Sequence, residues 1–182
     1  STTENIAYRQ RQRLNEDAKR AIAQAVAAQV PDGCSLILNI GTTAEAIALA
    51  LLQHRGLRVI TNNLNVAAIL SDAPGCEVTV AGGQVRSRDR GIIGETTVEF
   101  ISQFRVDIGV IGISGIESDG SLRDFDVREV KVAQAIMRAS RQVWLAADHS
   151  KFDRPAMVAL GHLEQVHRLF TDQPPPPHFQ AL

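Results

Sequence analysis

Five short segments of the chain concentrate glycine, hydroxyl, amide and charged side chains, and each follows an apolar run. Glycine lets a ligand approach the backbone closely, and exposed amides, hydroxyls and lysine donate hydrogen bonds to an anion such as a phosphate. No single turn is specific, but the set predicts a binding site for a small phosphorylated molecule. The segments are Gly41-Thr42-Thr43, Thr61-Asn62-Asn63, Gly82-Gly83-Gln84-Val85-Arg86, Gly112-Ile113-Ser114-Gly115 and Asp148-His149-Ser150-Lys151.

The first segment has the chemistry of an anion site. Gly41, Thr42 and Thr43 open a predicted helix, where backbone amides and hydroxyls are free to bind a phosphate. A phosphate carries nearly two negative charges, so we expect a cation beside it, and Lys151 is the candidate because it follows another strand. The alternative is a plain helix cap. Thr42 and Glu45 have the spacing of a capping box, which would occupy two of the amides internally.

The remaining polar residues suit the hydroxyl end of the same ligand. For Asp148 the alternative is a surface ion pair with Lys151, which contributes little to stability. Arg86 lies nearest to the glycine pair, and its alternative is a solvated charge cluster with Asp89. The residues predicted for this end are Asn62, Asn63, Gly82, Gly83, Arg86, Ser114, Gly115 and Asp148.

Length and composition narrow the classes of function. The chain has 182 residues, 45% of them hydrophobic, and a net charge of -1, which fits one globular domain that does not grip the phosphate backbone of DNA by itself. No apolar run of about 18 residues and no signal peptide occurs, so we expect a cytoplasmic protein without a membrane partner. The histidines show no ligand spacing, which predicts no metal and no cofactor.

Elements of two kinds must position these turns. Apolar runs alternate with stretches of helical periodicity, which predicts an α/β fold with a mainly parallel sheet and helices on both faces. The runs are 34–38, 57–61, 76–81, 106–111, 142–147 and 166–171, and the helical stretches are 15–30, 43–53, 63–71, 95–103 and 125–138. In such a sheet, ligands bind beyond the carboxyl ends of the strands, where all five polar segments fall.

The chain divides into three parts. Residues 1–14 are polar and are expected to form an exposed lead-in, residues 15–172 form the α/β domain, and residues 173–182 form a proline-rich tail in the polyproline-II conformation. The first residue is Ser1 and not methionine, so we expect a fragment of a longer protein.

In these segments the sequence resembles the effector-binding domain of DeoR-type bacterial transcription regulators. The likeness runs from about Tyr8 to Asp172, nearly the whole chain. The longer motifs are most similar to the members that respond to glycerol 3-phosphate. These motifs are Asn62-Asn63-Leu64-Asn65-Val66, Arg86-Ser87-Arg88-Asp89, Gly91-Ile92-Ile93-Gly94-Glu95, Phe100-Ile101-Ser102-Gln103-Phe104-Arg105 and Asp148-His149-Ser150-Lys151-Phe152.

The resemblance implies a fold related to ribose-5-phosphate isomerase, glucosamine-6-phosphate deaminase and CoA-transferases. It implies a homo-oligomer that senses a phosphorylated sugar or polyol, here glycerol 3-phosphate, and a winged helix-turn-helix, absent from this chain, through which the whole protein binds DNA. Ligand binding is expected to lower operator affinity. One departure concerns an aspartate that many members have just before the glycine-threonine-threonine turn. This chain has Asn39-Ile40 there, which removes the basis for a sugar-hydroxyl contact at that point.

The alternative function is an enzyme of the same fold, a sugar-phosphate isomerase or deaminase. Such an enzyme needs a carboxylate placed as a general base beside the reacting carbon. The turn 112–116 contains no titratable side chain, and Glu117 and Asp119 flank a turn at Gly120 where acids are solvated. Glu129 is the exception, because a helix could aim it at the pocket. The sequence therefore favours a sensor and predicts no catalytic residue.

Overall fold

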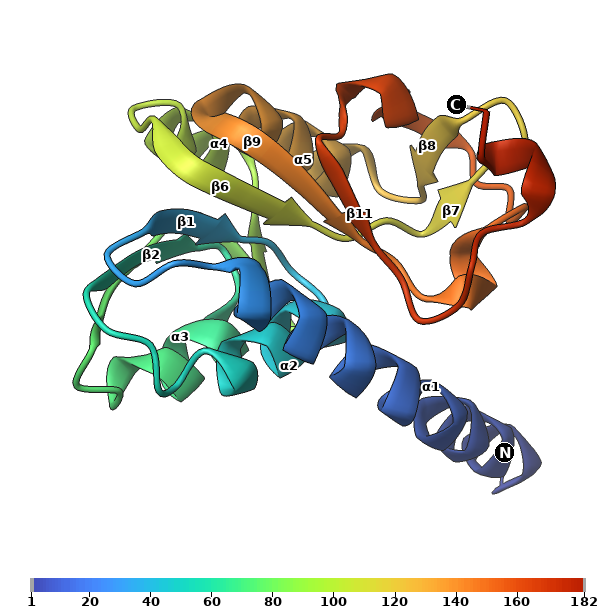
Figure 1. The fold of residues 1–182 in the computed structure, drawn as a ribbon, viewed down its shortest axis with the longest axis horizontal. Coiled ribbons are helices and arrows are strands. Elements are labelled where there is room, and N and C mark those ends of the chain that lie inside the picture. Colours follow the sequence, from blue (N-terminus) through green and yellow to red (C-terminus); the bar gives the residue numbers. More distant parts are fainter. Residues whose placement is uncertain (1, 182) are drawn as a thin grey trace.

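The chain forms a six-stranded parallel sheet between two layers of helices (Figure 1). The structure is a computed structural model that describes the backbone of residues 2–181 and the side chains of residues 15–181. The strand order is β11-β9-β6-β1-β2-β3, and all neighbours in the sheet are parallel. The strands are β1 (Ser35–Leu38), β2 (Leu57–Thr61), β3 (Cys76–Val80), β6 (Val106–Ile111), β9 (Ser140–Ala146) and β11 (Arg168–Phe170).

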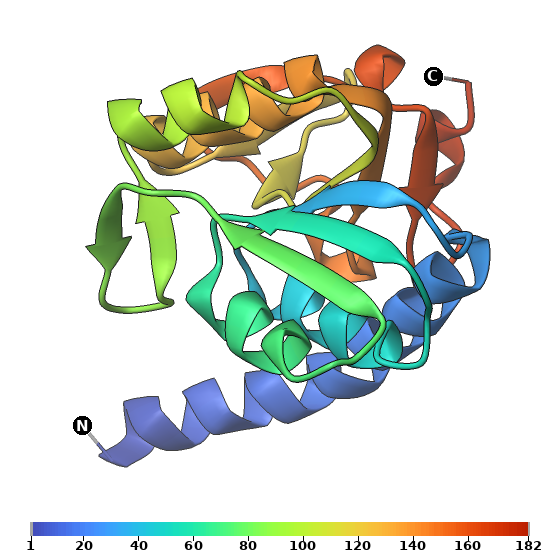
Figure 2. The ribbon, with the colours of Figure 1, turned by 90° about the vertical axis from the view of Figure 1, so that its left-hand side faces the viewer.

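Helices cover both faces of this sheet, which confirms the predicted fold class. One face carries α1 (Thr2–Gln29), α2 (Thr42–Ala50) and α3 (Leu64–Ser71), and the other carries α4 (Glu95–Ile101) and α5 (Val127–Ala139). Figure 2 shows the sheet between the two helical layers. None of the helices in the described part of the chain is long and apolar enough to cross a membrane.

The continuous apolar runs of the strands follow from this double cover. Successive side chains of a strand point to opposite faces, so Leu36 and Leu38 join the core under α1, α2 and α3, while Ile37 joins the core under α4 and α5. Both faces exclude water, and both therefore require apolar residues.

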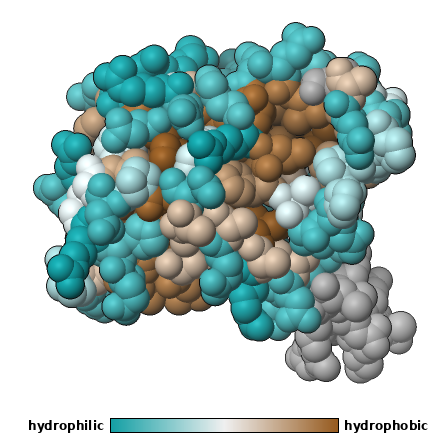
Figure 3. All heavy atoms as spheres, in the orientation of Figure 1, coloured by the Kyte–Doolittle hydropathy of each residue, from teal (hydrophilic) through white to brown (hydrophobic). Residues whose placement is uncertain are grey.

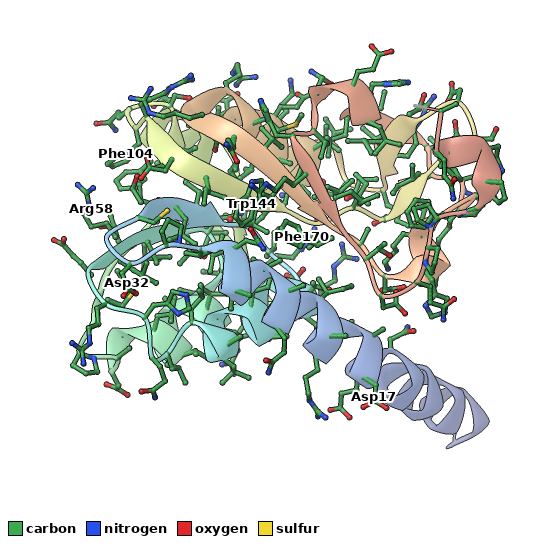
Figure 4. The ribbon with its side chains drawn as sticks, viewed as in Figure 1. Asp17, Asp32, Arg58, Phe104, Trp144 and Phe170 are labelled. Atoms are coloured by element: carbon green, nitrogen blue, oxygen red, sulfur yellow. The ribbon has the colours of Figure 1, made fainter. Side chains whose placement is uncertain are left out.

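Trp144 lies in the core beneath α1, as its position within a strand predicts. Its side chain is buried and packs against Phe170 of the edge strand β11, with ring centroids 5.1 Å apart (Figure 4). Arg168 lies over the Trp144 ring, with its guanidinium carbon 5.3 Å from the ring centroid. This cluster closes the edge of the sheet at β11.

Several short elements were not predicted from the sequence. A two-stranded hairpin pairs β4 (Gln84–Arg86) with β5 (Gly91–Ile93), and a separate antiparallel sheet has the order β10-β8-β7. Its strands are β7 (Gly115–Ile116), β8 (Ser121–Asp124) and β10 (Val158–His162). Three short 3-10 helices complete the chain: η1 (His149–Lys151), η2 (Leu163–Gln165) and η3 (Pro177–Phe179). Runs of two to five residues are too short for a periodic pattern to distinguish them from loops.

The two ends of the chain differ from the sequence-based expectation. Residues 2–14 are helical and continue into residues 15–29 as one helix, α1, which extends away from the domain at its amino-terminal end (Figure 1). Residues 1–14 were predicted as an exposed lead-in separate from the domain because they are polar, but polar residues propagate a helix that is already nucleated on the core.

At the other end, the tail folds back onto the domain. Only 5% of the Phe179 side chain is exposed, and its ring lies 5.1 Å from that of Phe152. His178 adds a 3.1 Å contact between its Nε2 and Oδ1 of Asp153. The expectation of a free polyproline tail is therefore wrong beyond Pro176. One aromatic side chain close to the carboxyl end supplies enough apolar area to hold the segment.

This packing predicts that Phe179 stabilises the domain. We expect Phe179→Ala to lower the free energy of unfolding by about 3 kcal/mol, because it leaves a cavity beside Phe152. Met157, 91% exposed, provides the control, and Met157→Ala should change the free energy of unfolding by less than about 0.5 kcal/mol. Urea unfolding of both variants measures the difference, and equal values would contradict a packed tail.

Candidate functional site

A cavity of about 170 Å³ lies where the carboxyl ends of β1, β6 and β9 meet. The turn into α2 forms one wall, and η1 with the end of β9 forms another. Lys19 of α1, Asp124 of β8 and Glu129 of α5 complete the lining. Of the residues predicted for the site, Gly41, Thr42, Thr43, Ser114, Asp148 and Lys151 line this cavity.

The first turn of α2 presents uncapped amides to this cavity. Gly41 is the N-cap residue with φ 122°, a conformation that side-chain-bearing residues rarely adopt, and no side chain caps the helix. Thr42 is the first helical residue, and the amide of Glu45 already bonds the Gly41 carbonyl at 3.2 Å. The capping-box interpretation is therefore wrong, because Thr42 lies one position too late to cap. The first amides of α2 stay available to an anion.

Two lysines from separate elements lie at the same cavity. Lys151 comes from η1 and Lys19 from α1. Burial lowers the pKa of Lys151, the nearby Asp148 opposes this effect, and Arg154 and Lys19 lower the pKa further. Two cations and free helix amides that converge in this way favour a ligand with more than one negative charge.

Asp148 holds the turn that carries Lys151. Its side chain is 1% exposed and accepts hydrogen bonds from the backbone N–H of Ser150 at 2.9 Å and from the Ser150 hydroxyl. It is the N-cap of η1. The alternative of a surface ion pair with Lys151 is thus wrong, since Asp148 is buried and caps the turn.

Two further carboxylates line the cavity, Asp124 and Glu129. Ser114 donates from Oγ to Oδ1 of Asp124 at 2.8 Å. Burial raises the pKa of Glu129, Asp124 raises it further, and Arg86 opposes both. Lys19 and Asp124 were missed in the sequence-based site, and Glu129 was considered only as a catalytic base. Glu129 lies in the first turn of a helix that follows a strand, and this position in the sequence could have predicted that it lines the cavity.

Asn62 and Asn63 were predicted to bind ligand hydroxyls, but neither lines the cavity. Both are 0% exposed. Asn62 donates to the Ile92 carbonyl at 3.2 Å and so ties β5 to the end of β2. Asn63 is the N-cap of α3, accepting from the amides of Asn65 at 2.9 Å and Val66 at 3.2 Å. Their side-chain amides form hydrogen bonds with buried backbone groups. This explains why two asparagines follow β2 in succession.

The glycines outside the cavity have a packing role. Gly83 has φ 146°, and a Cβ there would overlap the Oγ1 of Thr97, which donates to the Gly82 carbonyl at 2.8 Å. At Gly115 a Cβ would overlap the carbonyl oxygen of Arg154. The close approach predicted for the glycines is present at Gly83 and Gly115, but the approaching group is protein. Gly82, Gly83 and Gly115 do not line the cavity.

Arg86 does not face the cavity either. Its side chain is 11% exposed and pairs with three carboxylates: Asp89 through Nε at 3.1 Å and through Nη2, Asp126 at 3.1 Å and Glu129 at 3.0 Å. A ligand contact by Arg86 and a solvated cluster are both inconsistent with this burial and these partners. The motif Arg86-Ser87-Arg88-Asp89 instead closes the β4–β5 hairpin and fixes it to α5.

Known proteins show which family shares this architecture. The family model for the DeoR C-terminal sensor domain matches residues 14–173. The chain belongs to this DeoR sensor-domain family. It is 51% identical over 176 residues to the glycerol-3-phosphate regulon repressor of Escherichia coli strain K12, which covers 97% of this chain and 70% of that protein. The glycerol-3-phosphate regulon repressor of Haemophilus influenzae is 52% identical over 175 residues, which covers 96% of this chain and 68% of the relative.

A further relative, the HTH-type transcriptional repressor CsqR of Escherichia coli strain K12, is 46% identical, with 97% of this chain and 67% of the relative covered. These relatives are transcriptional repressors and not enzymes. The predicted family and the sensor function are therefore confirmed, and the isomerase or deaminase alternative is not favoured. The chain is the sensor domain of a DeoR-type transcriptional repressor.

Solved structures confirm the predicted relation of the fold. Ribose 5-phosphate isomerase A from Methanocaldococcus jannaschii superposes with a TM-score of 0.55 at 16% identity, covering 76% of this chain and 55% of the isomerase. The delta subunit of eIF2B from Chaetomium thermophilum superposes with a TM-score of 0.64 at 17% identity, covering 86% of this chain and 56% of that chain. At such low identity the likeness shows a shared fold alone.

The burial of Asn63 predicts a structural effect of its substitution. Asn63→Ala should lower the free energy of unfolding by about 1–2 kcal/mol, because α3 loses its cap and buried backbone loses a partner. The neighbouring Asn65 makes a single side-chain contact of 3.4 Å with Arg90, and Asn65→Ala should cost less than about 0.5 kcal/mol. Urea unfolding measures both. A large loss of ligand affinity at unchanged stability would instead show that Asn63 binds the ligand.

Proposed function

We propose that the domain binds glycerol 3-phosphate, or a closely related phosphorylated polyol, in the cavity at the ends of β1, β6 and β9. The observation that supports this most directly is the convergence of uncapped α2 amides with Lys151 and Lys19 in one small cavity. Relatives of about 51% identity that are named glycerol-3-phosphate regulon repressors support the identity of the ester. Binding controls the DNA affinity of a winged helix-turn-helix elsewhere in the whole protein, which acts in the cytoplasm.

The phosphate occupies the part of the cavity nearest to Gly41. The amides and hydroxyls of Thr42 and Thr43 donate to its oxygens, and the two lysines neutralise its charge. Such an arrangement needs no metal ion, because helix amides and lysines together supply the positive potential. In the described part of the chain, no group of three or more His, Cys, Asp and Glu side chains could hold a metal ion.

The size of the cavity favours a small ester. At about 170 Å³ it is smaller than the roughly 300–1,000 Å³ of sites that take drug-sized ligands. Its lining also offers Ser114 and carboxylates, which suit hydroxyl groups. A three-carbon polyol phosphate matches both the volume and this mixed lining of cations and hydrogen-bond acceptors.

Helix α1 connects the cavity to the rest of the protein. Lys19 lies on α1 and lines the cavity, and α1 continues without a break to Thr2, away from the domain (Figure 1). A phosphate that attracts Lys19 therefore acts directly on this helix. The ligand can change operator affinity only by the difference in its affinity for the two arrangements of α1.

We also propose that the domain forms a homo-oligomer. Large apolar side chains are exposed at Leu49, Phe125 and Val127. In Figure 3, hydrophobic residues reach the surface in the half of the molecule that contains β11, within a hydrophilic surround. Apolar surface of this kind is typical of protein contacts.

Ligand binding should raise the melting temperature of the chain. At a glycerol 3-phosphate concentration about 100 times its dissociation constant, the stabilisation is roughly 2.7 kcal/mol. For a domain of this length that corresponds to about 5 to 10 °C. Glycerol should give no shift, because it lacks the charge that the α2 amides and the lysines bind. Lys151→Ala should abolish the shift without changing the fold.

Two neighbouring residues of α1 provide a matched control for the same measurement. Lys19 and Arg20 both line a groove between α1 and α2, but only Lys19 also lines the cavity. Lys19→Gln should reduce the shift, and Arg20→Gln should leave it unchanged. A shift that survives both Lys151→Ala and Lys19→Gln would refute the phosphate site.

The affinity should depend on pH in a direction set by Lys151. Burial lowers the pKa of this lysine, so its ammonium form is lost at a lower pH than that of an exposed lysine. A phosphate ester is dianionic above about pH 7 and prefers the charged lysine. The affinity for glycerol 3-phosphate should therefore fall between about pH 7 and about pH 9.5.

Calorimetric titration at the two pH values measures this change. Lys151→Arg should remove most of the dependence, because a guanidinium group stays charged throughout the range. If the arginine variant loses affinity with pH as steeply as the wild type, another group causes the dependence.

A further inference from the structure

The cavity has one carboxylate that the phosphate site leaves unexplained. Glu129 lines the cavity, yet a second anion there is unfavourable unless it binds a hydrogen-bond donor. Its side chain is 20% exposed and it lies in the first turn of α5. A carboxylate in such a place is costly to bury, so its presence calls for a partner on the cavity side.

One oxygen of this carboxylate is already bound. Arg86 donates from Nη1 to Oε2 of Glu129 at 3.0 Å, and among the described residues none donates to Oε1. The same Nη1 contacts Oδ2 of Asp126 at 3.1 Å, and Asp89 binds the remaining edge of the guanidinium group. Asp89 also accepts from the Gly91 amide at 3.1 Å, which fixes the hairpin. Arg86 therefore holds Glu129 from outside the cavity in one orientation.

The lining of the cavity carries charges of both signs. Its cations are Lys19 and Lys151, and its carboxylates are Asp124, Glu129 and Asp148. Asp124 raises the pKa of both Lys151 and Glu129, so its charge acts on both groups. Its Oδ1 accepts from the Ser114 hydroxyl and from the Phe125 amide, both at 2.8 Å. A ligand that fills the cavity therefore meets both cations and carboxylates.

We propose that Glu129, positioned by Arg86, accepts a hydrogen bond from a ligand hydroxyl and makes the site selective for phosphorylated polyols over phosphate esters without hydroxyls. This inference rests on the proposed phosphate site and adds the group that recognises the other end of the ligand. Carboxylates accept hydrogen bonds from hydroxyls strongly, and they repel a second phosphate. Glu129 is a binding residue in this proposal, and Arg86 is a positioning residue.

Two esters that differ only in their hydroxyls test the proposal on the 182-residue chain. Glycerol 3-phosphate has two hydroxyl groups, and n-propyl phosphate has none on the same three carbons. Calorimetric titration gives the dissociation constant of each for the wild type, Glu129→Gln and Asp126→Asn. Asp126 is the matched control because it shares Arg86 with Glu129 but does not line the cavity.

We expect the wild type to prefer glycerol 3-phosphate by tenfold or more, the usual range for a hydrogen bond to a charged group. Glu129→Gln should lower that preference at least fivefold while n-propyl phosphate binds within about twofold of the wild-type value. Asp126→Asn should keep the preference. Melting temperatures without ligand show whether each variant folds as the wild type does.

Arg86 is tested by the same preference, which a purely structural role would not change. Arg86→Met should lower the preference, because Glu129 loses its support, and Arg86→Lys should restore part of it. Loss of affinity for both esters to the same extent in Glu129→Gln, or no loss for either, would overturn the proposal. If the wild type binds both esters equally, the phosphate site stands and hydroxyl recognition by Glu129 fails. If it binds neither, the proposed function fails as well.

Discussion

The unpartnered backbone amides at the amino-terminal turn of α2 determine which groups must surround this turn. An α-helix begins with amides that have no partner within the helix, and those of α2 lack a side-chain cap. Gly41 can adopt φ 122° because it has no Cβ, and this turns the chain from β1 into the helix with its amides toward the cavity. Buried donors without acceptors are costly, so the site is complete only with an anion or with water. Lys151 and Lys19 then favour the anion.

The buried asparagines make this open turn possible. Asn63 caps α3 with its oxygen and places its Nδ2 within 3.5 Å of the carbonyl oxygens of Asn39 and Gly41. It thus links the beginning of α3 to the turn before α2, and Asn62 links the same strand end to β5. The uncapped start of α2 is thus held by hydrogen bonds that Asn63 makes to the backbone on both sides of it. Polar residues at these strand ends are divided between those that line the cavity and those that hold the turns.

That division explains which strands, turns and site residues could be predicted from the sequence alone. Strands such as β1 and β2 were predicted well because burial on both faces leaves an unbroken apolar run. The turns around Gly41 and Lys151 were predicted because parallel strands bring their carboxyl ends together. Asn63 and Arg86 were wrongly predicted to contact the ligand, because residue type alone does not show whether a buried amide or guanidinium group binds a ligand or another part of the protein. Lys19 was missed because its helix precedes the sheet, and only the packing of α1 beside α2 brings it to the cavity.

The position of α1 limits how a ligand can act. Ile22 and Val26 anchor the helix in the same core as Ile47 of α2, so α1 cannot move far without α2. A ligand that contacts the first turn of α2 and Lys19 of α1 therefore touches both members of a packed pair. Packed cores change between discrete arrangements more readily than they deform, so a displacement of one member of this pair requires repacking against the other. A helix of 28 residues has a contour of roughly 40 Å, so a slight rotation at Lys19 becomes a larger displacement at its far end.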